Sequence, residues 1–418
     1  MKLLYDIAIK SYGLGIIYSS ILGNKKANDW INGRKNCLEK IKEDLNNESP
    51  IWIHVSSLGE YIMAKPLISK LLVEFPKKNI LLTFFSPSGF NNVKLKNERI
   101  NKHYLPLDTP SNAKEFINTV NPCIAVFAKY DFWFNYLIEL QKANIRTLFF
   151  STNLNSNQLY FKKGWSWQKS ILKKISKLLV LNQKVDSFLK KENFENTMVC
   201  GDTRFDEVRI NKKLDQDIIL KYINNRVCLV LGSSWEAEEK ILKKALLKLN
   251  NIAIIMAPHD VSAKRIYSIE KRFRNKTLKL SQLKESNLNR KKLLIVDSIG
   301  ILSNLYHYSD IAFIGGGFKN KLHNILEPAA TNNVILFGCN HSKYIEANEL
   351  IKINGAIKIA SALDLVETIN KMSTIEELEP YKKTAFNYVE NNKGATEIIL
   401  KEIMKLISHS TTSASSKI

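Results

Sequence analysis

Short apolar segments alternate along this chain with longer segments of helical periodicity, and this alternation restricts the fold more than any other feature. The apolar runs do not alternate strictly with polar residues, so we expect both faces of each strand to be buried. In the first half the expected strands are 51–55, 80–85, 124–128, 147–150, 178–181 and 197–200. In the second half they are 227–231, 252–256, 293–296, 311–314, 334–337 and 356–359. Buried strands separated by helices predict parallel sheets in an α/β fold.

The expected strands form two sets, and a polar helical segment separates them. A chain of 418 residues is long enough for two sizeable cores. We therefore expect two Rossmann-like, doubly wound parallel-sheet domains that face a central cleft, with ligands beyond the carboxyl ends of the strands. The expected parts are an N-terminal helix (1–23), a first domain (24–206), a linker (207–225), a second domain that includes the final helix (226–407) and a disordered tail (408–418).

The charge of the chain is strongly positive. It has 62 Lys and Arg against 40 Asp and Glu, a formal net charge of +22. One interpretation is a lysine-rich coding background, and the other is an anionic partner such as a membrane surface or a phosphorylated ligand. The lysines are scattered rather than gathered with arginines and aromatics in one stripe, so no nucleic-acid partner is expected. The cysteines and histidines lack metal-ligand spacing, so no metal site is expected.

The first residues of the chain suggest a helix at a membrane surface. Residues 3–22 are mostly apolar, but Asp6 and Lys10 interrupt them, and a spanning helix needs about 20 apolar residues with few charges. Apolar side chains recur along one helix face, at Leu3, Ile7, Leu14, Ile17 and Ile21. Basic residues follow directly. This pattern fits a helix that lies in an anionic interface, and it fits equally a helix packed on its own domain.

Two carboxylates stand where expected strands of the first half end. Glu60 follows the strand 51–55, three residues after Ser57. That spacing fits a capping box at a helix start, and a carboxylate at this edge of a sheet also fits a general base. Asp131 follows the strand 124–128, where it is either a helix-start acid or a group in the ligand site. The residues alone leave both pairs of alternatives open.

Small and polar residues end the expected strands of the second half. Two interpretations fit Ser233 and Ser234, which either bind a phosphate at a helix start or cap that helix. His259 either binds a phosphate or has a structural role. The glycines 315–317 leave bare backbone for a close ligand. Glu327, at a helix start, accepts the hydroxyls of a ribose or complements the helix dipole. Together these strand ends indicate one ligand pocket.

Several short motifs follow one another along the chain. They are W-I-H-V-S-S-L-G-E (52–60), Y-L-P-L-D (104–108), K-Y-D-F-W-F-N (129–135), G-D-T-R-F-D (201–206), G-S-S-W-E-A-E-E (232–239), A-P-H (257–259), V-D-S-I-G (296–300), G-G-G-F (315–318) and H-N-I-L-E-P (323–328). In this order and spacing, over nearly the whole chain, they resemble the Kdo transferases. These bacterial enzymes add 3-deoxy-D-manno-octulosonic acid (Kdo) to lipid A precursors.

The resemblance implies an inverting GT-B glycosyltransferase, with the acceptor on the first domain and CMP-Kdo on the second. It implies that Glu60 is the catalytic base and that Asp131 and Arg204 stabilise the transition state, although family members often have Glu in place of Asp131. It implies no metal and no cofactor, CMP-Kdo being the donor substrate. The strand ends and the resemblance together predict CMP-Kdo binding by Ser233, Ser234, Pro258, His259, Ile299, Gly300, Ile301, Gly315, Gly316, Asn324, Ile325, Leu326 and Glu327.

The resemblance also implies partners and a location. The expected partners are a lipid A precursor, CMP-Kdo and an anionic membrane surface, and the expected location is the cytoplasmic face of the inner membrane. Two alternatives remain. One is a GT-B glycosyltransferase that uses a UDP-sugar, and the other is a non-catalytic protein of the same fold that binds anionic lipid or nucleic acid.

Overall fold

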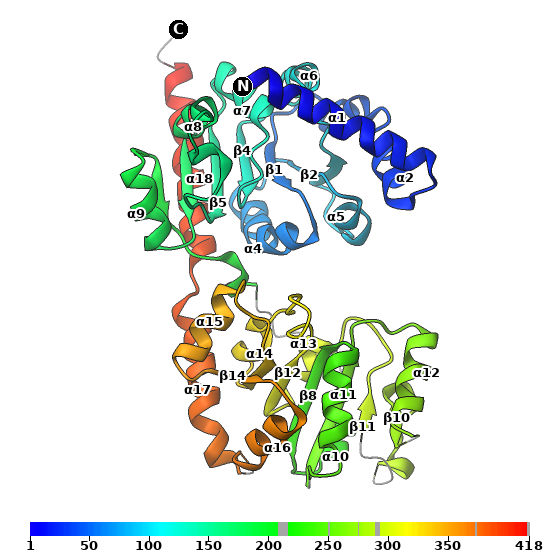
Figure 1. Ribbon diagram of the computed structural model, residues 1–418. Coiled ribbons are helices and arrows are strands. Elements are labelled where there is room, and N and C mark those ends of the chain that lie inside the picture. Colours follow the sequence, from blue (N-terminus) through cyan, green and yellow to red (C-terminus); the bar gives the residue numbers. More distant parts are fainter. Residues whose placement is uncertain (208–215, 250, 275, 289–292, 373, 416–418) are drawn as a thin grey trace. The chain divides into compact units, whose positions relative to one another are not determined.

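A computed structural model describes residues 1–207, 216–249, 251–274, 276–288, 293–372 and 374–415. The chain divides into two compact units. Unit 1 comprises Met1–Glu207 and the C-terminal segment from Lys393 onward, and unit 2 comprises the residues between them. Each unit has one parallel sheet with helices on its faces (Figure 1).

The sheet of unit 1 has seven parallel strands in the order β3-β2-β1-β4-β5-β6-β7. Strand β1 lies in its interior, between β2 and β4. The chain winds from β1 first in one direction and then in the other, and the switch between β1 and β4 is where such sheets bind ligands. The strands are β1 Ile51–Val55, β2 Ile80–Phe84, β3 Ile100–Tyr104, β4 Ile124–Ala128, β5 Thr147–Thr152, β6 Lys177–Val180 and β7 Thr197–Val199.

Helices cover both faces of this sheet because both faces are apolar. Successive side chains of a strand point to opposite faces, so Ile51 and Ile53 join one buried cluster while Trp52 joins the other. The helices of unit 1 are α1 Lys2–Ile21, α2 Lys25–Asn32, α3 Cys37–Leu45, α4 Leu58–Glu74, α5 Pro87–Asn92, α6 Pro110–Val120, α7 Phe134–Lys142, α8 Ser166–Lys173, α9 Gln183–Lys191 and α18 Ala395–Ser415, with short 3-10 helices η1 Leu159–Phe161 and η2 Thr203–Phe205.

The sheet of unit 2 is also parallel, with seven strands in the order β10-β11-β9-β8-β12-β13-β14. Its strands are β8 Val227–Ser234, β9 Ile252–Pro258, β10 Thr277–Lys279, β11 Leu293–Ile295, β12 Ile311–Ile314, β13 Val334–Gly338 and β14 Ala356–Ile359. Its helices are α10 Gln216–Ile223, α11 Glu236–Ala245, α12 Ala263–Arg272, α13 Leu302–Leu305, α14 Leu326–Ala330, α15 Ile345–Lys352, α16 Ala362–Asn370 and α17 Ile375–Asn391, with η3 Leu280–Gln282 and η4 Glu285–Asn287. The two sheets confirm the predicted α/β class with two doubly wound, Rossmann-like parallel sheets.

All the strands expected from the sequence are present, with small shifts at their ends and a longer β8. Strands β3 and β10 were not predicted as strands. Each lies at the edge of its sheet. An edge strand has one hydrogen-bonded neighbour and can keep polar side chains in solvent, so it lacks the apolar run that marks a central strand.

The final helix differs from the prediction, because α18 belongs to unit 1 and not to the second domain. Its buried Ile399 and Ile403 join the cluster that contains Ile53 of β1. At the start of the helix, Asp206 accepts hydrogen bonds from the backbone N–H groups of the segment 394–396. The apolar face of α18 therefore completes the core of unit 1.

Two further segments differ from the predicted boundaries. The tail predicted to be disordered from residue 408 instead continues α18 to Ser415, and residues 416–418 lie outside the described residues. In the predicted linker 207–225, residues 208–215 lie outside the described residues, and α10 is a helix of unit 2.

Helix α1 packs on unit 1 along one side. The hydroxyl of Tyr5 donates a 2.5 Å hydrogen bond to Oδ2 of Asp108, and Asp6 accepts one of 2.9 Å from the side chain of Asn135. Gly13 is buried in this contact. The charge of Asp6, which interrupts the apolar sequence, is therefore turned toward the protein.

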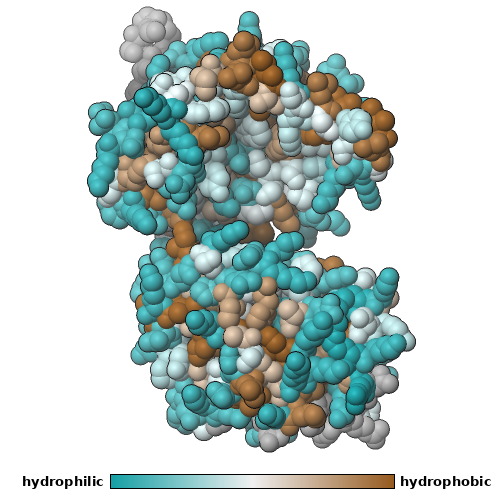
Figure 2. Space-filling view, in the orientation of Figure 1, coloured by the Kyte–Doolittle hydropathy of each residue, from teal (hydrophilic) through white to brown (hydrophobic). Residues whose placement is uncertain are grey.

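The opposite side of α1 leaves large apolar side chains in solvent, and Figure 2 shows them as brown patches along the helix. They are Leu3, Leu4, Ile7, Leu14, Ile17, Tyr18 and Ile21. Among the described residues, no helix combines the length and the apolar character that crossing a membrane requires.

Candidate functional site

The carboxyl edge of the unit 1 sheet carries Glu60. Strand β1 ends at Val55 and α4 begins at Leu58, so Glu60 lies in the first turn of that helix. The hydroxyl of Ser57 donates a hydrogen bond to Oε2 of Glu60, and it accepts none from the amides at the helix start. Ser57 therefore does not cap the helix through its side chain, as the capping-box alternative requires, and its hydroxyl bonds to the carboxylate of Glu60 instead.

A serine just before the same helix and a lysine that follows a neighbouring strand together keep Glu60 ionised. Nζ of Lys129 lies 3.3 Å from Oε1 of Glu60, whose side chain is 16% exposed. Burial raises the pKa of Glu60, but the hydrogen bond from Ser57 and the charge of Lys129 outweigh it, so the pKa falls below its ordinary value. A partly exposed, ionised carboxylate at a ligand-binding edge is the state that a general base needs.

Asp131 lies in the same loop as Lys129, after β4. Burial raises the pKa of Asp131 to about 6, with Ser56 hydrogen bonding lowering it and the charge of Glu60 raising it. Among the described residues, Oδ2 of Asp131 has no hydrogen-bond partner although it is buried. The two carboxylates thus differ in protonation, because Glu60 ionises first and Asp131 retains a proton to higher pH.

A buried, neutral histidine supports this edge of the sheet. His54 of β1 is fully buried, and burial lowers its pKa to about 3. Nε1 of Trp133 donates a 3.0 Å hydrogen bond to Nε2 of His54. The proton of His54 is therefore on Nδ1, which lies 2.9 Å from the hydroxyl of Thr83. This network was not predicted from the sequence, where its signal is a histidine within an apolar strand.

Arg204 lies in η2, which contacts α4. Its Nε and Nη2 atoms donate to Oδ2 of Asp202, at 2.9 and 2.7 Å. The side chain of Arg204 is 37% exposed and that of Asp202 is 6% exposed. Arg204 therefore lies in a segment that contacts α4, the helix whose first turn contains Glu60, and its guanidinium group is paired with Asp202.

The carboxyl edge of the unit 2 sheet brings together several residues predicted to bind the donor. Strands β9, β8 and β12 are neighbours, so the segments that follow them meet. The backbone N–H of His259 donates to the carbonyl of Ser234 at 3.1 Å, and that of Gly315 donates to the carbonyl of Gly232 at 2.8 Å. These strand ends form a continuous backbone surface.

The two serines of this edge differ in what they offer a ligand. The side chain of Ser234 is buried, and its hydroxyl donates to Oε1 of Glu239 at 3.1 Å. Ser233 is partly exposed and has φ of +51°, in the left-handed region. The end of β8 thus leaves the side chain of Ser233 accessible to a ligand and buries that of Ser234.

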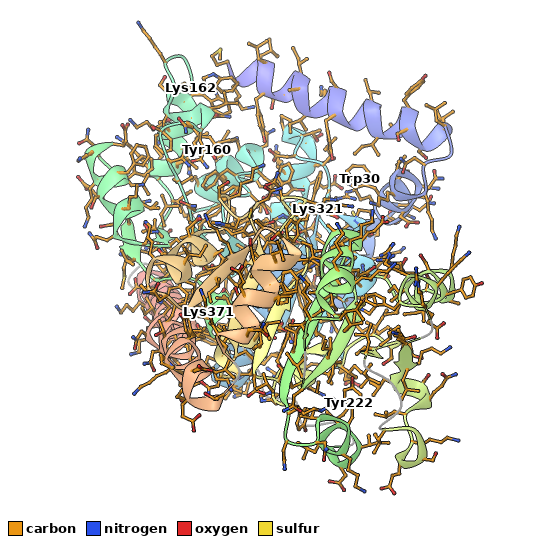
Figure 3. The ribbon with its side chains drawn as sticks, turned by 60° about the horizontal axis from the view of Figure 1, so that its bottom comes forward. Trp30, Tyr160, Lys162, Tyr222, Lys321 and Lys371 are labelled. Carbon is orange, nitrogen blue, oxygen red and sulfur yellow. The ribbon has the colours of Figure 1, made fainter. Side chains whose placement is uncertain are left out.

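Two of the glycines meet backbone atoms closely. A Cβ atom at Gly315 would lie 2.0 Å from the carbonyl oxygen of Ser233. One at Gly316 would lie 2.0 Å from the carbonyl oxygen of Lys321, which is labelled in Figure 3. Close backbone packing therefore requires both glycines, whether or not a ligand approaches them.

Three aromatic rings stack at the same edge. The ring of Trp235 stacks on His259 with centroids 4.5 Å apart, and His323 lies 4.7 Å from His259. Nε1 of Trp235 donates to Nε2 of His323 at 3.0 Å, and burial and the nearby His259 lower the pKa of His323 to about 4. His323 is therefore a neutral acceptor, while His259 is exposed to ligands. His259 was predicted as a site residue from the sequence, and its two ring partners were not.

The remaining donor-site residues lie in two loops. Ile299 is 85% exposed after β11, and Gly300 has φ of +94°, with Ile301 next to α13. Pro258, Ile325 and Leu326 are buried and so offer backbone rather than side chains.

Glu327 lies in the first turn of α14. The side-chain amide of Asn324 donates to Oε1 of Glu327 at 3.1 Å. Within the described ranges, no group of three His, Cys, Asp or Glu side chains is placed to hold a metal ion.

Comparison with known proteins relates the chain to one family. Residues 32–207 match the family described as 3-deoxy-D-manno-octulosonic-acid transferase (kdotransferase). A bifunctional glycosyltransferase/methyltransferase of Fusobacterium nucleatum is 28% identical over 334 residues, covering 75% of this chain and 50% of that protein, so this chain spans about half its length. A 3-deoxy-D-manno-octulosonic acid transferase of Rickettsia felis is 25% identical over 379 residues, covering 86% of this chain and 80% of the relative.

Solved structures share the fold. A UDP-GlcNAc 2-epimerase from Neisseria meningitidis, bound to UDP-GlcNAc, has a TM-score of 0.56 at 13% identity, covering 85% of this chain and 100% of that one. At this identity the likeness concerns the fold alone. Because an epimerase has the same fold, the reaction must be argued from the site and the sequence family.

Proposed function

Since the chain belongs to the Kdo transferase family, we propose that this glycosyltransferase moves Kdo from CMP-Kdo to a lipid A precursor, with inversion at the anomeric carbon. The observation that carries the proposal is the carboxylate of Glu60, held ionised by Ser57 and Lys129 at the carboxyl edge of a doubly wound sheet. Both residues fall within the segment that matches the family. A sugar hydroxyl has a pKa far above neutral, so its attack needs a base at this position.

In the proposed reaction the acceptor hydroxyl lies against Glu60. Its oxygen attacks the anomeric carbon of Kdo while Glu60 takes the proton. The bond from that carbon to the phosphate oxygen breaks, and CMP leaves with the electron pair. Asp131 and Arg204 stabilise the transition state, Arg204 through its charge and Asp131 through the buried oxygen that lacks a protein partner.

Unit 2 supplies the donor site in this proposal. His259 meets the phosphate of CMP, and Glu327 accepts the hydroxyls of the cytidine ribose. Ser233 and the backbone of the loop 299–301 add donors to the phosphate. The buried residues of the segment 324–327 contribute through their backbone.

We further propose that α1 lies on the cytoplasmic face of the inner membrane. Its exposed side presents Leu3, Ile7 and Leu14, while Asp6 is occupied by Asn135. A net charge of +22 favours an anionic surface, and each basic side chain near such a surface adds about 1 kcal/mol. A helix with these properties lies in the interface.

Mass spectrometry of a lipid A precursor incubated with CMP-Kdo and this protein tests the proposal. We expect a mass increase of one or more Kdo units, inhibited by CMP and not by UDP. Inhibition by UDP instead would favour a UDP-sugar enzyme. Salt-sensitive lipid binding without any mass increase would favour the non-catalytic alternative.

A further inference from the structure

A pocket of about 400 Å³ lies between α1, α2 and the loop after β2, and the proposed reaction does not use it. Its lining is mainly apolar and aromatic, with Tyr12 and Ile16 from α1, Trp30 from α2 and Phe85 from the loop. Trp30 lies on the side of α1 that faces the rest of unit 1 (Figure 3). The pocket therefore lies on the inner side of the helix whose outer side is apolar and exposed.

Arg34 fixes two walls of this pocket. Its guanidinium carbon lies 3.7 Å from the centroid of the Trp30 ring. Nη1 of Arg34 donates to the carbonyl of Trp30 at 3.1 Å, and Nη2 donates to the carbonyl of Phe85 at 2.7 Å. The rings of Trp30 and Phe85 meet edge to face, 5.8 Å apart. The pocket is thus formed before a ligand binds, which lowers the entropy cost of binding.

The pocket lies beside the edge of the sheet that carries the proposed base, Glu60. Phe85 and Ser86 follow β2, which pairs with the strand that leads to Glu60. The backbone N–H of Ser86 donates to the carbonyl of Ser56 at 2.8 Å, and the ring of Phe85 lies 4.6 Å from that of Trp133. A ligand with its apolar end in the pocket can therefore present its polar end at the edge of Glu60.

We propose that this pocket holds an acyl chain of the acceptor. The inference rests on the proposed transfer to a lipid A precursor, and it gives the acceptor site a lipid-binding part. Each methylene group that moves from water into an apolar pocket increases the affinity by about fourfold. The aromatic and aliphatic walls therefore favour an acyl chain over a polar sugar. Lys26 also lines the pocket, is exposed, and has no carboxylate partner among the described residues, so it suits a phosphate of the same acceptor.

A second pocket, of about 490 Å³, also has Trp30 in its wall. It lies against α3 and the loop after β3, with Ile31, Leu38 and Leu107 in its lining. Charged side chains, among them Glu39 and Glu115, also line this second pocket, so the first pocket suits an acyl chain better.

Gly15 allows the first pocket to be narrowed without disturbing the fold. It lines the pocket, and a Cβ atom placed there meets no atom within 4 Å. Gly15→Leu therefore adds a branched side chain to the wall of the pocket without a clash and narrows it, while Gly15→Ala, the matched control, adds only a methyl group. Both variants remove a glycine from a helix interior, so neither is expected to weaken α1.

The experiment compares KM and kcat for an acylated lipid A precursor and for the same disaccharide bisphosphate after removal of its acyl chains. We expect Gly15→Leu to raise KM for the acylated acceptor about 10- to 100-fold and to leave transfer to the deacylated acceptor unchanged. Gly15→Ala should match the wild type with both acceptors.

Other results would overturn the assignment. Equal changes of KM for both acceptors, or no change for either, would exclude an acyl chain from the pocket while wild-type transfer left the proposed function standing. Wild-type protein that transfers Kdo to neither acceptor would overturn the proposed function and this inference with it. Weaker binding of Gly15→Leu to phosphatidylglycerol vesicles, with unchanged KM, would assign the pocket to a bilayer lipid instead.

Discussion

Nζ of Lys129 lies 3.3 Å from one carboxylate oxygen of Glu60, and the hydroxyl of Ser57 donates to the other. Burial at this position works against a charged carboxylate, and the two partners reverse that effect. The backbone of Lys129 has φ of +58°, a conformation that is costly for a residue other than glycine. Backbone strain of this kind is typical of functional sites, and here it accompanies the contact that keeps the proposed base ionised.

Glu60→Gln is expected to abolish most of the transfer. Glutamine keeps the shape of the side chain but is far too weak a base, so turnover at saturating CMP-Kdo should fall about 10²- to 10⁴-fold. Because Ser57 does not cap α4 through its side chain, stability should change by less than about 1 kcal/mol. Both are measured, by a transfer assay and by thermal melting. Near-normal turnover with a lower melting temperature would give Glu60 a structural role.

Lys129→Met is expected to move the pH dependence of transfer. Without the ammonium group the pKa of Glu60 rises, so a smaller fraction is ionised at a given acidic pH. The acidic limb of the profile of kcat/KM against pH should therefore shift to higher pH, and Lys129→Arg, which keeps the charge, should restore it. If Met and Arg gave the same profile as Lys, the ion pair would play no part in setting the base.

The sequence predicts this fold well where strands are buried on both faces. Ile124–Ala128 and Ile311–Ile314 are continuous apolar runs, and both are central strands. Ile100–Tyr104 and Thr277–Lys279 contain polar residues, and solvent at the sheet edge permits them. Helix α18 could not be assigned to unit 1 from its pattern, because an apolar helix face does not indicate which core it covers.

The sequence predicts the positions of the candidate site residues in the fold only where they lie at strand ends. Glu60, Asp131 and His259 each follow a strand, and topology alone places them at ligand-binding edges. The contacts of Trp133 with His54 and of Trp235 with His323 join residues 79 and 88 positions apart. Such pairs leave no local period in a sequence, so only the folded chain reveals them.

Glu327→Ala is expected to weaken CMP binding. If the carboxylate accepts ribose hydroxyls, its loss removes charged hydrogen bonds and should reduce the affinity by about 1.5–3 kcal/mol. Titration calorimetry with CMP measures this directly. Glu327→Gln serves as a variant of equal size that removes only the charge. Its side-chain oxygen can still accept the hydrogen bond from Asn324. Unaltered CMP affinity in Glu327→Ala would contradict the ribose role.

Serine substitutions on the outer side of α1 are expected to weaken binding to anionic vesicles. Leu3, Ile7 and Leu14 are at least half exposed, so their replacement should leave the fold intact while each loses up to about 2 kcal/mol of membrane binding. Val73→Ser on α4, where the side chain is 79% exposed, is the matched control. Equal vesicle binding by the triple variant and this control would rule out α1 as the membrane contact. Deletion of the helix is a poorer test, because Tyr5 bonds to a buried carboxylate.

That carboxylate, Asp108, makes the stability of unit 1 depend on pH. It is 1% exposed, and burial raises its pKa to about 7, with the hydrogen bonds from Tyr5 and from the amides of Asn135 and Tyr136 lowering it. In the unfolded chain an aspartate titrates near about 3.9. Between these values the folded protein binds more protons, so its free energy of unfolding falls as pH rises from about 4 to about 7. Asp108→Asn should remove this slope.

Tyr5→Phe separates the contribution of the hydroxyl from that of the ring. The hydroxyl donates to Asp108 and lowers its pKa, so it stabilises the ionised form more than the protonated form. Urea unfolding should therefore show a loss of about 1.5–3 kcal/mol at pH 8, where Asp108 is mostly charged, and of about 1 kcal/mol at pH 5, where it is mostly protonated. Tyr12→Phe, on the same helix and half exposed, should cost little at either pH. Equal losses for Tyr5→Phe at the two pH values would mean that Asp108 does not change its protonation between pH 5 and pH 8 in the folded protein.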